Sequence, residues 1–287
     1  MKDKTINDPN MGFPQIVDSL GIRKGEVLMV SSDINRLFYS EYARTGEIPN
    51  IDTLIDSLKV AVGEEGTLMF PTFTWDFCKG KPFDIKKSPC KTGTLSNAVL
   101  KRTDFRRTRH PLYSFAVWGK DTELLCSMDN VSSFGEGTPF EYFYNVHARN
   151  LLIDINLTQG YTFTHHCEQA GKAPYRFFKK FKSEYINENG ESSIRTYTMY
   201  VRKLALNPLE DFTEMENEFL KNGIEQRIII NDIPYSFVDM HASFGPIVDD
   251  VVNNRSRKIY KIFTLNRWNN NASNRTTYDI KTKLANV

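Results

Sequence analysis

The chain has 287 residues, of which 40% are hydrophobic, 13% aromatic and 25% charged, and 37 basic against 35 acidic side chains give a net charge of +2. These numbers indicate a globular protein with a substantial core and disfavour disorder. The balanced charge disfavours a nucleic-acid-binding protein, and no apolar run is long enough to span a membrane. No signal peptide follows Met1, so we expect a cytoplasmic protein with neither nucleic acid nor membrane among its partners.

The first 75 residues alternate between helix and strand. Apolar residues recur at helical spacing over 13–20 and 51–62, and a glycine follows each segment. Short buried strands are expected at 27–30 and 67–70, where apolar residues are continuous. This alternation predicts an α/β domain, in which ligands bind where strands end. Polar residues follow both strands: Ser31, Ser32 and Asp33 after the first, and Thr72 and Thr74 after the second.

The middle of the chain combines a polar loop with further elements of both kinds. Residues 76–93 are expected to form a long loop, and Thr94 is a candidate cap for a short helix. Strands are expected at 114–118 and 151–155, and helices from near Phe140 and Thr162.

The pattern is less regular beyond about residue 183. A hairpin from Tyr185 to Val201 around Asn189-Gly190, a helix ending at Gly223 and a second hairpin within 227–238 are expected there. The polar segment 265–287 is expected to be a tail, which leaves residues 1–264 as a single domain. The four cysteines have neither a C-x-x-C pair nor regular spacing, so we expect reduced thiols.

Reactive side chains are most concentrated in the segment from Thr162 to Glu168. His165 and Glu168 are three residues apart, so on a helix they share a face and can form a hydrogen bond. A carboxylate that binds one imidazole nitrogen fixes the tautomer and leaves the other nitrogen free as a base. The residues alone leave a second interpretation open, in which the pair only stabilises a surface helix.

The same segment offers two weaker interpretations. A metal site is disfavoured because His165 and His166 point about 100° apart on a helix, and no distant ligand set is evident. A nucleophilic Cys167 is disfavoured because sequence neighbours do not face each other, and a small buried residue is the alternative. His147 and His241 stand alone and receive no role.

Basic residues gather at 101–109 and 172–182. Such runs are either solvated faces or binding sites for an anionic small molecule. In the first run, Arg107, Thr108 and His110 form either a rigid turn before a proline or a phosphate site, because arginine matches phosphate geometry.

Six segments between about Phe13 and Arg176 occur in an order that is typical of one family. They are VLMVSSDI at 27–34, GTLMFPTFTW at 66–75, TGTLSNAVLKR at 92–102, RRTRHPLYSFAVWG at 106–119, FGEGTPFEYF at 134–143 and LLIDINLTQGYTFTHHCE at 151–168. In this order the chain resembles the aminoglycoside 3-N-acetyltransferases, enzymes that use acetyl-CoA to acetylate an amino-sugar amine. The resemblance implies a three-layer αβα fold with a central mixed sheet, in a single domain with a less regular C-terminal part.

The resemblance also assigns residues to a site. The family pattern T-x-x-H-x-x-E falls on Thr162, His165 and Glu168, which implies His165 as general base and Glu168 as the residue that orients it. The pattern R-S-x-H-P falls on Arg107, Thr108, His110 and Pro111, with threonine in place of serine. The cofactor-binding residues implied are Ser31, Ser32, Thr72, Arg107, Thr108 and His110, the substrate-binding residues are Thr74, Asp76 and Thr162, and no metal is expected.

The chain departs from the family at two strand ends. The histidine usual beside the serines of the first strand is absent at Ser31-Ser32, and the glycine usual after the Leu-Leu strand is Asp154. The pI near 8.2 and the two basic runs point toward an anionic acceptor, such as a nucleotide-linked amino sugar.

We therefore expect an acetyl-CoA-dependent N-acetyltransferase in which the amine of an aminoglycoside or a nucleotide-linked amino sugar attacks directly. Its partners would be acetyl-CoA and a small-molecule amine acceptor, and a homodimer is left open. A non-catalytic relative that binds an acyl-CoA or a sugar is the alternative, and an acyl-transfer enzyme built on Cys167 is a more distant one.

Overall fold

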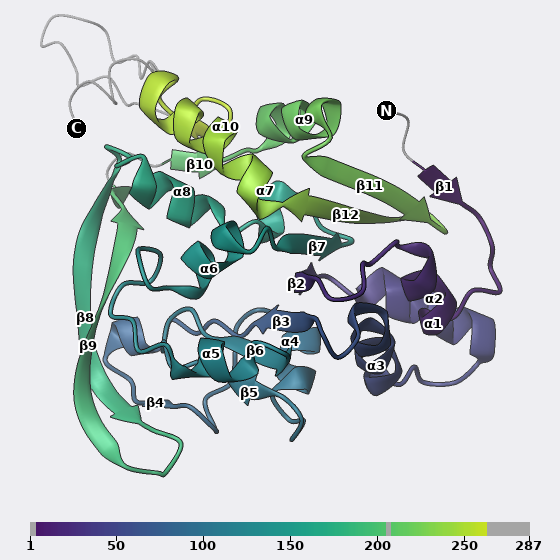
Figure 1. Cartoon of the computed structure of the whole chain (residues 1–287), viewed down its shortest axis with the longest axis horizontal. Coiled ribbons are helices and arrows are strands. Elements are labelled where there is room, and N and C mark those ends of the chain that lie inside the picture. The colour runs from purple at the N-terminus through teal and green to yellow at the C-terminus, as the bar shows by residue number, and fades with distance from the viewer. Residues whose placement is uncertain (1–3, 205–207, 263–287) are drawn as a thin grey trace, which may run out of the picture.

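The computed structural model describes residues 4–204 and 208–262, and a single large mixed sheet lies at its centre (Figure 1). The strands of this sheet are β1 Lys4–Ile6, β2 Val27–Ser32, β3 Thr67–Pro71, β5 Arg106–Arg107, β6 Phe115–Gly119, β7 Arg149–Ile153, β11 Glu225–Ile230 and β12 Ile233–Asp239. They lie in the order β1-β11-β12-β7-β2-β3-β6-β5. Strand β2 is parallel to its neighbours β7 and β3, whereas β6 and β12 run antiparallel to the strands beside them.

Both faces of the central strands are buried. In β2, Met29 packs into a core on one face of the sheet, while Leu28 and Val30 pack into a core on the other. In β3, Met69 packs into the same core as Met29, and Leu68 packs into the same core as Leu28. Successive side chains of a strand point to opposite faces, so a continuous apolar run requires helices on both sides. The predicted three-layer fold with a central mixed sheet is confirmed.

Helices cover the two faces. Those that share the core of Leu28 are α1 Phe13–Ser19, α2 Asn35–Thr45, α3 Ile51–Val62 and α4 Thr94–Val99. Those that share the core of Met29 are α5 Thr122–Ser127, α6 Pro139–Asn145, α7 Leu157–Gly160, α8 Thr164–Ala170, α9 Thr213–Asn222 and α10 Met240–Asn253. Within the described ranges, no helix has the length and hydropathy that crossing a bilayer requires.

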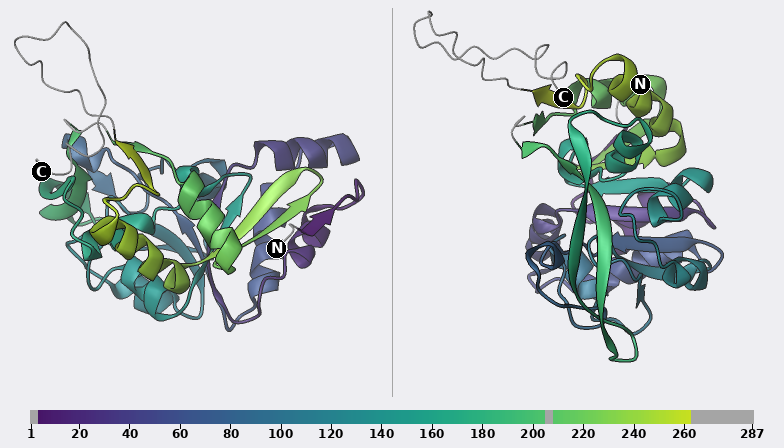
Figure 2. Two further views of the ribbon diagram at one scale, coloured as in Figure 1. Left: turned by 90° about the horizontal axis from the view of Figure 1, so that it is seen from above. Right: turned by 90° about the vertical axis from the view of Figure 1, so that its left-hand side faces the viewer.

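A long hairpin of β8 (Arg176–Ile186) and β9 (Ser192–Arg202) runs along one side of the molecule (Figure 2, right). It pairs with β4 (Phe83–Asp84) in a three-stranded sheet, and β10 (Pro208–Glu210) pairs with β13 (Tyr260–Ile262). The predicted turn at Asn189-Gly190 is confirmed. The first strand begins at Arg176, well before the expected start near Tyr185, because exposed lysines interrupt the apolar alternation that marks a strand.

Several other boundaries differ from the sequence-based expectation. Helix α8 begins at Thr164, not at Thr162, and Gly93 rather than Thr94 occupies the position before α4. The expected loop at 76–93 contains β4 and a short 3₁₀ helix, Phe77–Lys79.

Four helices were not expected from the sequence: α2, α5, α7 and α10. Helix α2 is largely polar and exposes most of its residues, so it has a weak periodic signal. Helix α10 contains Pro246, and an internal proline ordinarily ends a helical pattern. The helix that ends before Gly223 and the hairpin of β11 and β12 are confirmed, and the predicted tail at 265–287 lies outside the described residues.

Candidate functional site

Two cavities, of about 470 and 450 Å³, share part of their lining. We call the first the strand-end cavity, because it lies at the carboxyl ends of β2 and β3. We call the second the hairpin cavity, because it lies between α7 and residues of β8 and β9. Six residues line both: Trp75, Tyr113, Gln159, Gly160, Thr162 and His165. His165 therefore stands where the two cavities meet.

The strand-end cavity holds two of the residues predicted to bind the cofactor. Ser31 and Ser32 line it from the end of β2, at the edge where open α/β sheets bind ligands. Lys91, Thr92 and Thr94 line it as well and were not predicted as site residues. The family-like segment at 92–102 was the sequence signal that could have identified Thr92 and Thr94.

A glycine brings the loop before α8 close to the end of β2. A Cβ atom at Gly160 would lie 3.3 Å from Cβ of Ser31 and 3.2 Å from a methyl of Leu152, and it would collide with Ile155. A larger residue at this last position of α7 would therefore force Ile155 to shift and would crowd Leu152 and Ser31. This close packing places α8, and with it His165, beside the strand-end cavity.

The predicted hydrogen bond between His165 and Glu168 is confirmed. Nδ1 of His165 lies 2.7 Å from Oε2 of Glu168, and both residues lie on one face of α8. The Glu168 side chain is completely buried, whereas 21% of the His165 side chain is exposed. The carboxylate is thus fixed in the interior and the imidazole reaches the cavities.

Three further side chains surround the pair. Nη2 of Arg176 lies 2.8 Å from Oε2 of Glu168, and the Tyr175 hydroxyl donates to Oε1 at 2.8 Å. Arg176 in turn donates to the Tyr260 hydroxyl at 2.9 Å. Sequence reasoning missed these contacts because Arg176 stands in a basic run and Tyr260 lies far along the chain.

This environment shifts both pKa values of the pair downward. Burial raises the pKa of Glu168, but the charge of Arg176 and the bond from His165 outweigh it and bring that pKa to about 2. Burial and the charge of Arg176 lower the pKa of His165, against the opposing effect of Glu168. At neutral pH the pair is therefore an ionised carboxylate and a neutral imidazole.

The charges also fix the tautomer of His165. An ionised Glu168 can only accept, so Nδ1 carries the proton and donates it to Oε2. Arg176 approaches the same Nδ1 to 3.0 Å, but an arginine can only donate, so its hydrogen bond goes to Glu168. The lone pair of His165 is left on Nε2. Such a nitrogen can act as a general base toward a molecule in either cavity.

A family model described as aminoglycoside 3-N-acetyltransferase matches residues 29–246, which is most of the chain. The chain belongs to this family. The family's enzymes are acetyl-CoA-dependent N-acyltransferases, and the membership inferred from the sequence is confirmed.

Individual relatives are distant. The aminoglycoside N(3)-acetyltransferase IV of Salmonella sp is 27% identical over 160 residues, which cover 55% of this chain and 57% of that protein. The chain thus matches little more than half the length of this relative. Two solved structures, aminoglycoside acetyltransferase AAC(3)-Xa and the AAC-IIIb binary complex with CoASH, have TM-scores of 0.69 and 0.67 at 20% and 19% identity. The match to AAC(3)-Xa covers 84% of this chain and 93% of that chain, and the match to AAC-IIIb covers 83% and 95%. These matches show a common fold.

One departure from the family has a visible consequence. Asp154, where the family usually has glycine, adopts a φ of 54°, in the left-handed region that favours glycine. Its carboxylate forms an ion pair with Arg36 of α2 at 2.8 Å. Aspartate tolerates this conformation better than most residues, so the turn after β7 is kept.

Two of the implied cofactor-binding residues, Thr72 and Arg107, contact other parts of the fold. The Thr72 hydroxyl lies 3.0 Å from that of Ser114, and neither Thr72 nor Arg107 lines the strand-end or the hairpin cavity. The Arg107 guanidinium donates to the carbonyls of Thr72 at 2.7 Å and Ser88 at 2.5 Å. With a further bond from Nε to the Ser114 hydroxyl at 3.0 Å, these interior contacts engage three of the five N–H groups of Arg107.

Thr108 and His110 are also buried, away from both cavities. The Thr108 hydroxyl accepts the backbone N–H of Phe115 at 2.9 Å, and Nδ1 of His110 accepts that of Tyr113 at 3.2 Å. Burial lowers the pKa of His110 to about 3, which keeps it neutral and able to accept. Their contacts support the chain around Tyr113, which lines both cavities.

Of the three implied substrate-binding residues, one lines the cavities beside His165 and two do not. Thr162 lines both cavities. Thr74 is buried and Asp76 forms an ion pair with Lys81 at 3.4 Å, and neither lines a cavity beside His165. The structure thus brings Ser31, Ser32, Thr162 and His165 together.

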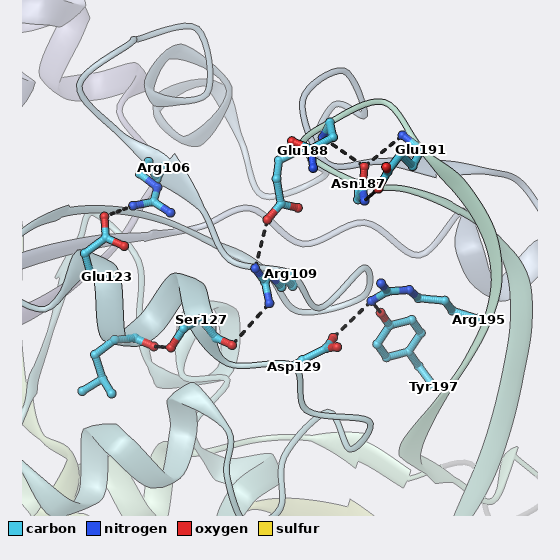
Figure 3. Close-up of polar contacts among 12 residues, drawn as sticks. Arg106, Arg109, Glu123, Ser127, Asp129, Asn187, Glu188, Glu191, Arg195 and Tyr197 are labelled. Atoms are coloured by element: carbon cyan, nitrogen blue, oxygen red, sulfur yellow. Dashed lines mark hydrogen bonds and ion pairs between the residues drawn. The ribbon is translucent and has the colours of Figure 1, made fainter.

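The basic run at 101–109 is largely neutralised by carboxylates. Arg102 pairs with Asp52, Asp56 and Asp104 at 2.7–2.9 Å. Figure 3 shows Arg106 beside Glu123, and Arg109 between the carboxylate of Glu188 and the carbonyl of Ser127. Arg109 therefore connects the turn of the β8–β9 hairpin to the end of α5. These contacts favour a structural role for Arg109 over a role in binding an anionic small molecule.

The remaining interpretations of the α8 segment gain no support. Cys167 is completely buried, and burial raises its pKa well above the ordinary value, which disfavours the reactive thiolate. Nδ1 of His166 faces the carbonyl of Phe134 at 2.6 Å, away from His165. In the part of the chain that the structure describes, no group of three or more histidine, cysteine, aspartate or glutamate side chains could hold a metal ion.

Proposed function

We propose that this chain is an acetyl-CoA-dependent N-acetyltransferase that acetylates the amine of an amino sugar, with His165 as general base and Glu168 as its orienting residue. One observation carries the proposal: a neutral imidazole, held by a buried carboxylate, stands where two cavities meet. A two-substrate transfer needs a base at such a junction, because the amine and the thioester must meet there.

We assign acetyl-CoA to the strand-end cavity. The Lys91 ammonium and the Thr94 hydroxyl are suited to phosphate oxygens, and Phe73 and Pro71 offer an apolar wall for the pantetheine arm. The CoASH complex of a protein with the same fold supports this class of co-substrate. When bound, acetyl-CoA supplies the thioester carbonyl that the amine attacks.

The hairpin cavity then holds the acceptor. Nε2 of His165 takes a proton from the amine as its nitrogen attacks the carbonyl, and Glu168 stabilises the resulting imidazolium. The carbon–nitrogen bond forms, the carbon–sulfur bond breaks, and the proton held on His165 can pass to the departing sulfur. No acyl-enzyme is required because an amine is already a competent nucleophile.

Arg176→Met is expected to move the acidic limb of kcat/KM to higher pH. In the wild type the charge of Arg176 helps to keep the pKa of His165 below its ordinary value, so the neutral base persists to lower pH. Without that charge the pKa of His165 rises, and activity begins to fall at a higher pH. The measurement is the pH profile of kcat/KM from about pH 5 to 8. Arg176→Lys keeps the charge and should keep the wild-type limb, whereas coincident profiles for Arg176→Met and wild type would contradict this role.

Cys167→Ala is expected to retain a kcat close to that of the wild type, because direct attack by the amine uses no thiol nucleophile. Steady-state kinetics on the folded variant tests this. A loss of kcat as large as that of His165→Ala would restore the acyl-transfer hypothesis based on Cys167.

The experiment for the proposed function is thiol release from acetyl-CoA with kanamycin, glucosamine or a nucleotide-linked amino sugar that has a free amine. We expect release together with an acetylated amine for at least one acceptor. Binding of CoA without release for any of them would favour the non-catalytic relative. The homodimer and the cytoplasmic location stay predictions, and light scattering on the purified chain tests the first.

A further inference from the structure

The hairpin cavity has few carboxylates in its lining. Among the described residues that line it, Glu210 is the one carboxylate, and Arg176 and Arg202 are the two guanidinium groups. Arg176 is already paired with Glu168, which does not line the cavity, at 2.8 Å. Glu210 already accepts from Arg202 at 2.9 Å and from the Tyr260 hydroxyl at 3.2 Å. An acceptor with several ammonium groups would find no unpaired carboxylate in this lining.

The residues outside the described ranges carry more basic than acidic side chains. Residues 205–207 carry no charged side chain, and residues 1–3 carry Lys2 and Asp3. Residues 263–287 contain one acidic side chain, Asp279, against the four basic side chains of Arg267, Arg275, Lys281 and Lys283. Together these segments hold two acidic against five basic side chains.

We propose that the acceptor is an amino sugar that carries a phosphate or carboxylate group, bound against Arg202 while its amine meets His165. This inference rests on the proposed acetyl transfer and names the class of its acceptor. The Arg202 side chain is 37% exposed and Glu210 engages its Nη1, which leaves other N–H groups of the guanidinium for an anion. Guanidinium groups bind phosphate and carboxylate oxygens through paired hydrogen bonds, whereas a lining without an unpaired carboxylate offers no ion-pair partner to an additional ammonium group.

The test compares kcat/KM for four amines: glucosamine, glucosamine 6-phosphate, muramic acid and kanamycin. The second and third add a phosphate and a carboxylate, respectively, to the glucosamine framework. We expect at least one anionic amine to exceed glucosamine by about tenfold or more, and the advantage to shrink at high salt. Comparing kcat/KM for glucosamine 6-phosphate and muramic acid shows whether the cavity prefers a phosphate or a carboxylate group.

Arg202→Gln should abolish most of that advantage, measured as the ratio of kcat/KM for the anionic amine to kcat/KM for glucosamine. Arg195→Gln is the matched control, because Arg195 lies on the same strand and pairs with Asp129 outside the cavity. Thermal unfolding of both variants checks that each is folded.

Three results would overturn the inference. Kanamycin turned over more efficiently than every anionic amine would refute it while leaving the proposed acetyl transfer intact. An anionic preference that Arg202→Gln does not alter would remove the assigned binding residue. Absence of thiol release with all four amines and with a nucleotide-linked amino sugar that has a free amine would refute the proposed function and the inference together.

Discussion

His165→Ala is expected to lower kcat by about 10²–10⁴-fold, which is the usual contribution of a positioned general base. The amine would still reach the thioester, but no group would take its proton, because Nε2 of His165 is the base that we place at the junction of the two cavities. Affinity for CoA should change little, because the residues assigned to the phosphates lie on other segments. Steady-state thiol release and calorimetric titration with CoA measure the two quantities.

The control for this variant is another histidine. His147→Asn alters an exposed residue that lines neither cavity, and asparagine tolerates its φ of 54°. It should keep the wild-type rate. A near-normal kcat for a folded His165→Ala protein would refute the mechanism.

Glu168→Gln is expected to lower the free energy of unfolding by about 3–5 kcal/mol, the usual cost of leaving a buried charge without its partner. The Arg176 side chain is only 4% exposed and would lose the carboxylate that lies 2.8 Å away. The rate should fall less than in His165→Ala, because the imidazole remains but its tautomer and orientation are less fixed. Urea unfolding and steady-state kinetics measure both effects.

The matched control is a glutamate in an exposed ion pair. Glu188 pairs with Arg109 at 3.0 Å and is 46% exposed, so Glu188→Gln should cost no more than about 1 kcal/mol. Equal losses of stability in the two variants would contradict the account of a buried pair. An unchanged rate in Glu168→Gln would show that His165 does not depend on this carboxylate.

The central strands could be predicted from the sequence because they are buried on both faces. Continuous apolar runs such as 27–30 leave little choice of structure once a helix precedes them and polar residues follow. The hydrogen bond between His165 and Glu168 followed from their spacing within one helix, since α8 places them on one face. Local periodicity was sufficient for both.

Contacts between distant elements could not be predicted in the same way. Arg176 belongs to a run of basic residues, and nothing in that run distinguishes the one side chain that turns inward to Glu168 from those that face solvent. Tyr260 meets Arg176 only because β13 returns to the hairpin. Likewise Arg107 and His110 carried phosphate-like chemistry in the sequence, but their positions in the fold give them interior partners.

The most direct test of the central claim is nitrogen-15 NMR of the histidine side chains, with the His165 signals identified by their absence in His165→Ala. Long-range proton–nitrogen correlations report the charge and the tautomer of an imidazole. The account predicts that at pH 7 His165 is neutral, with its proton on Nδ1 and its lone pair on Nε2. A charged imidazolium at pH 7, or a neutral ring protonated on Nε2, would contradict the assignment of His165 as the base that Glu168 orients.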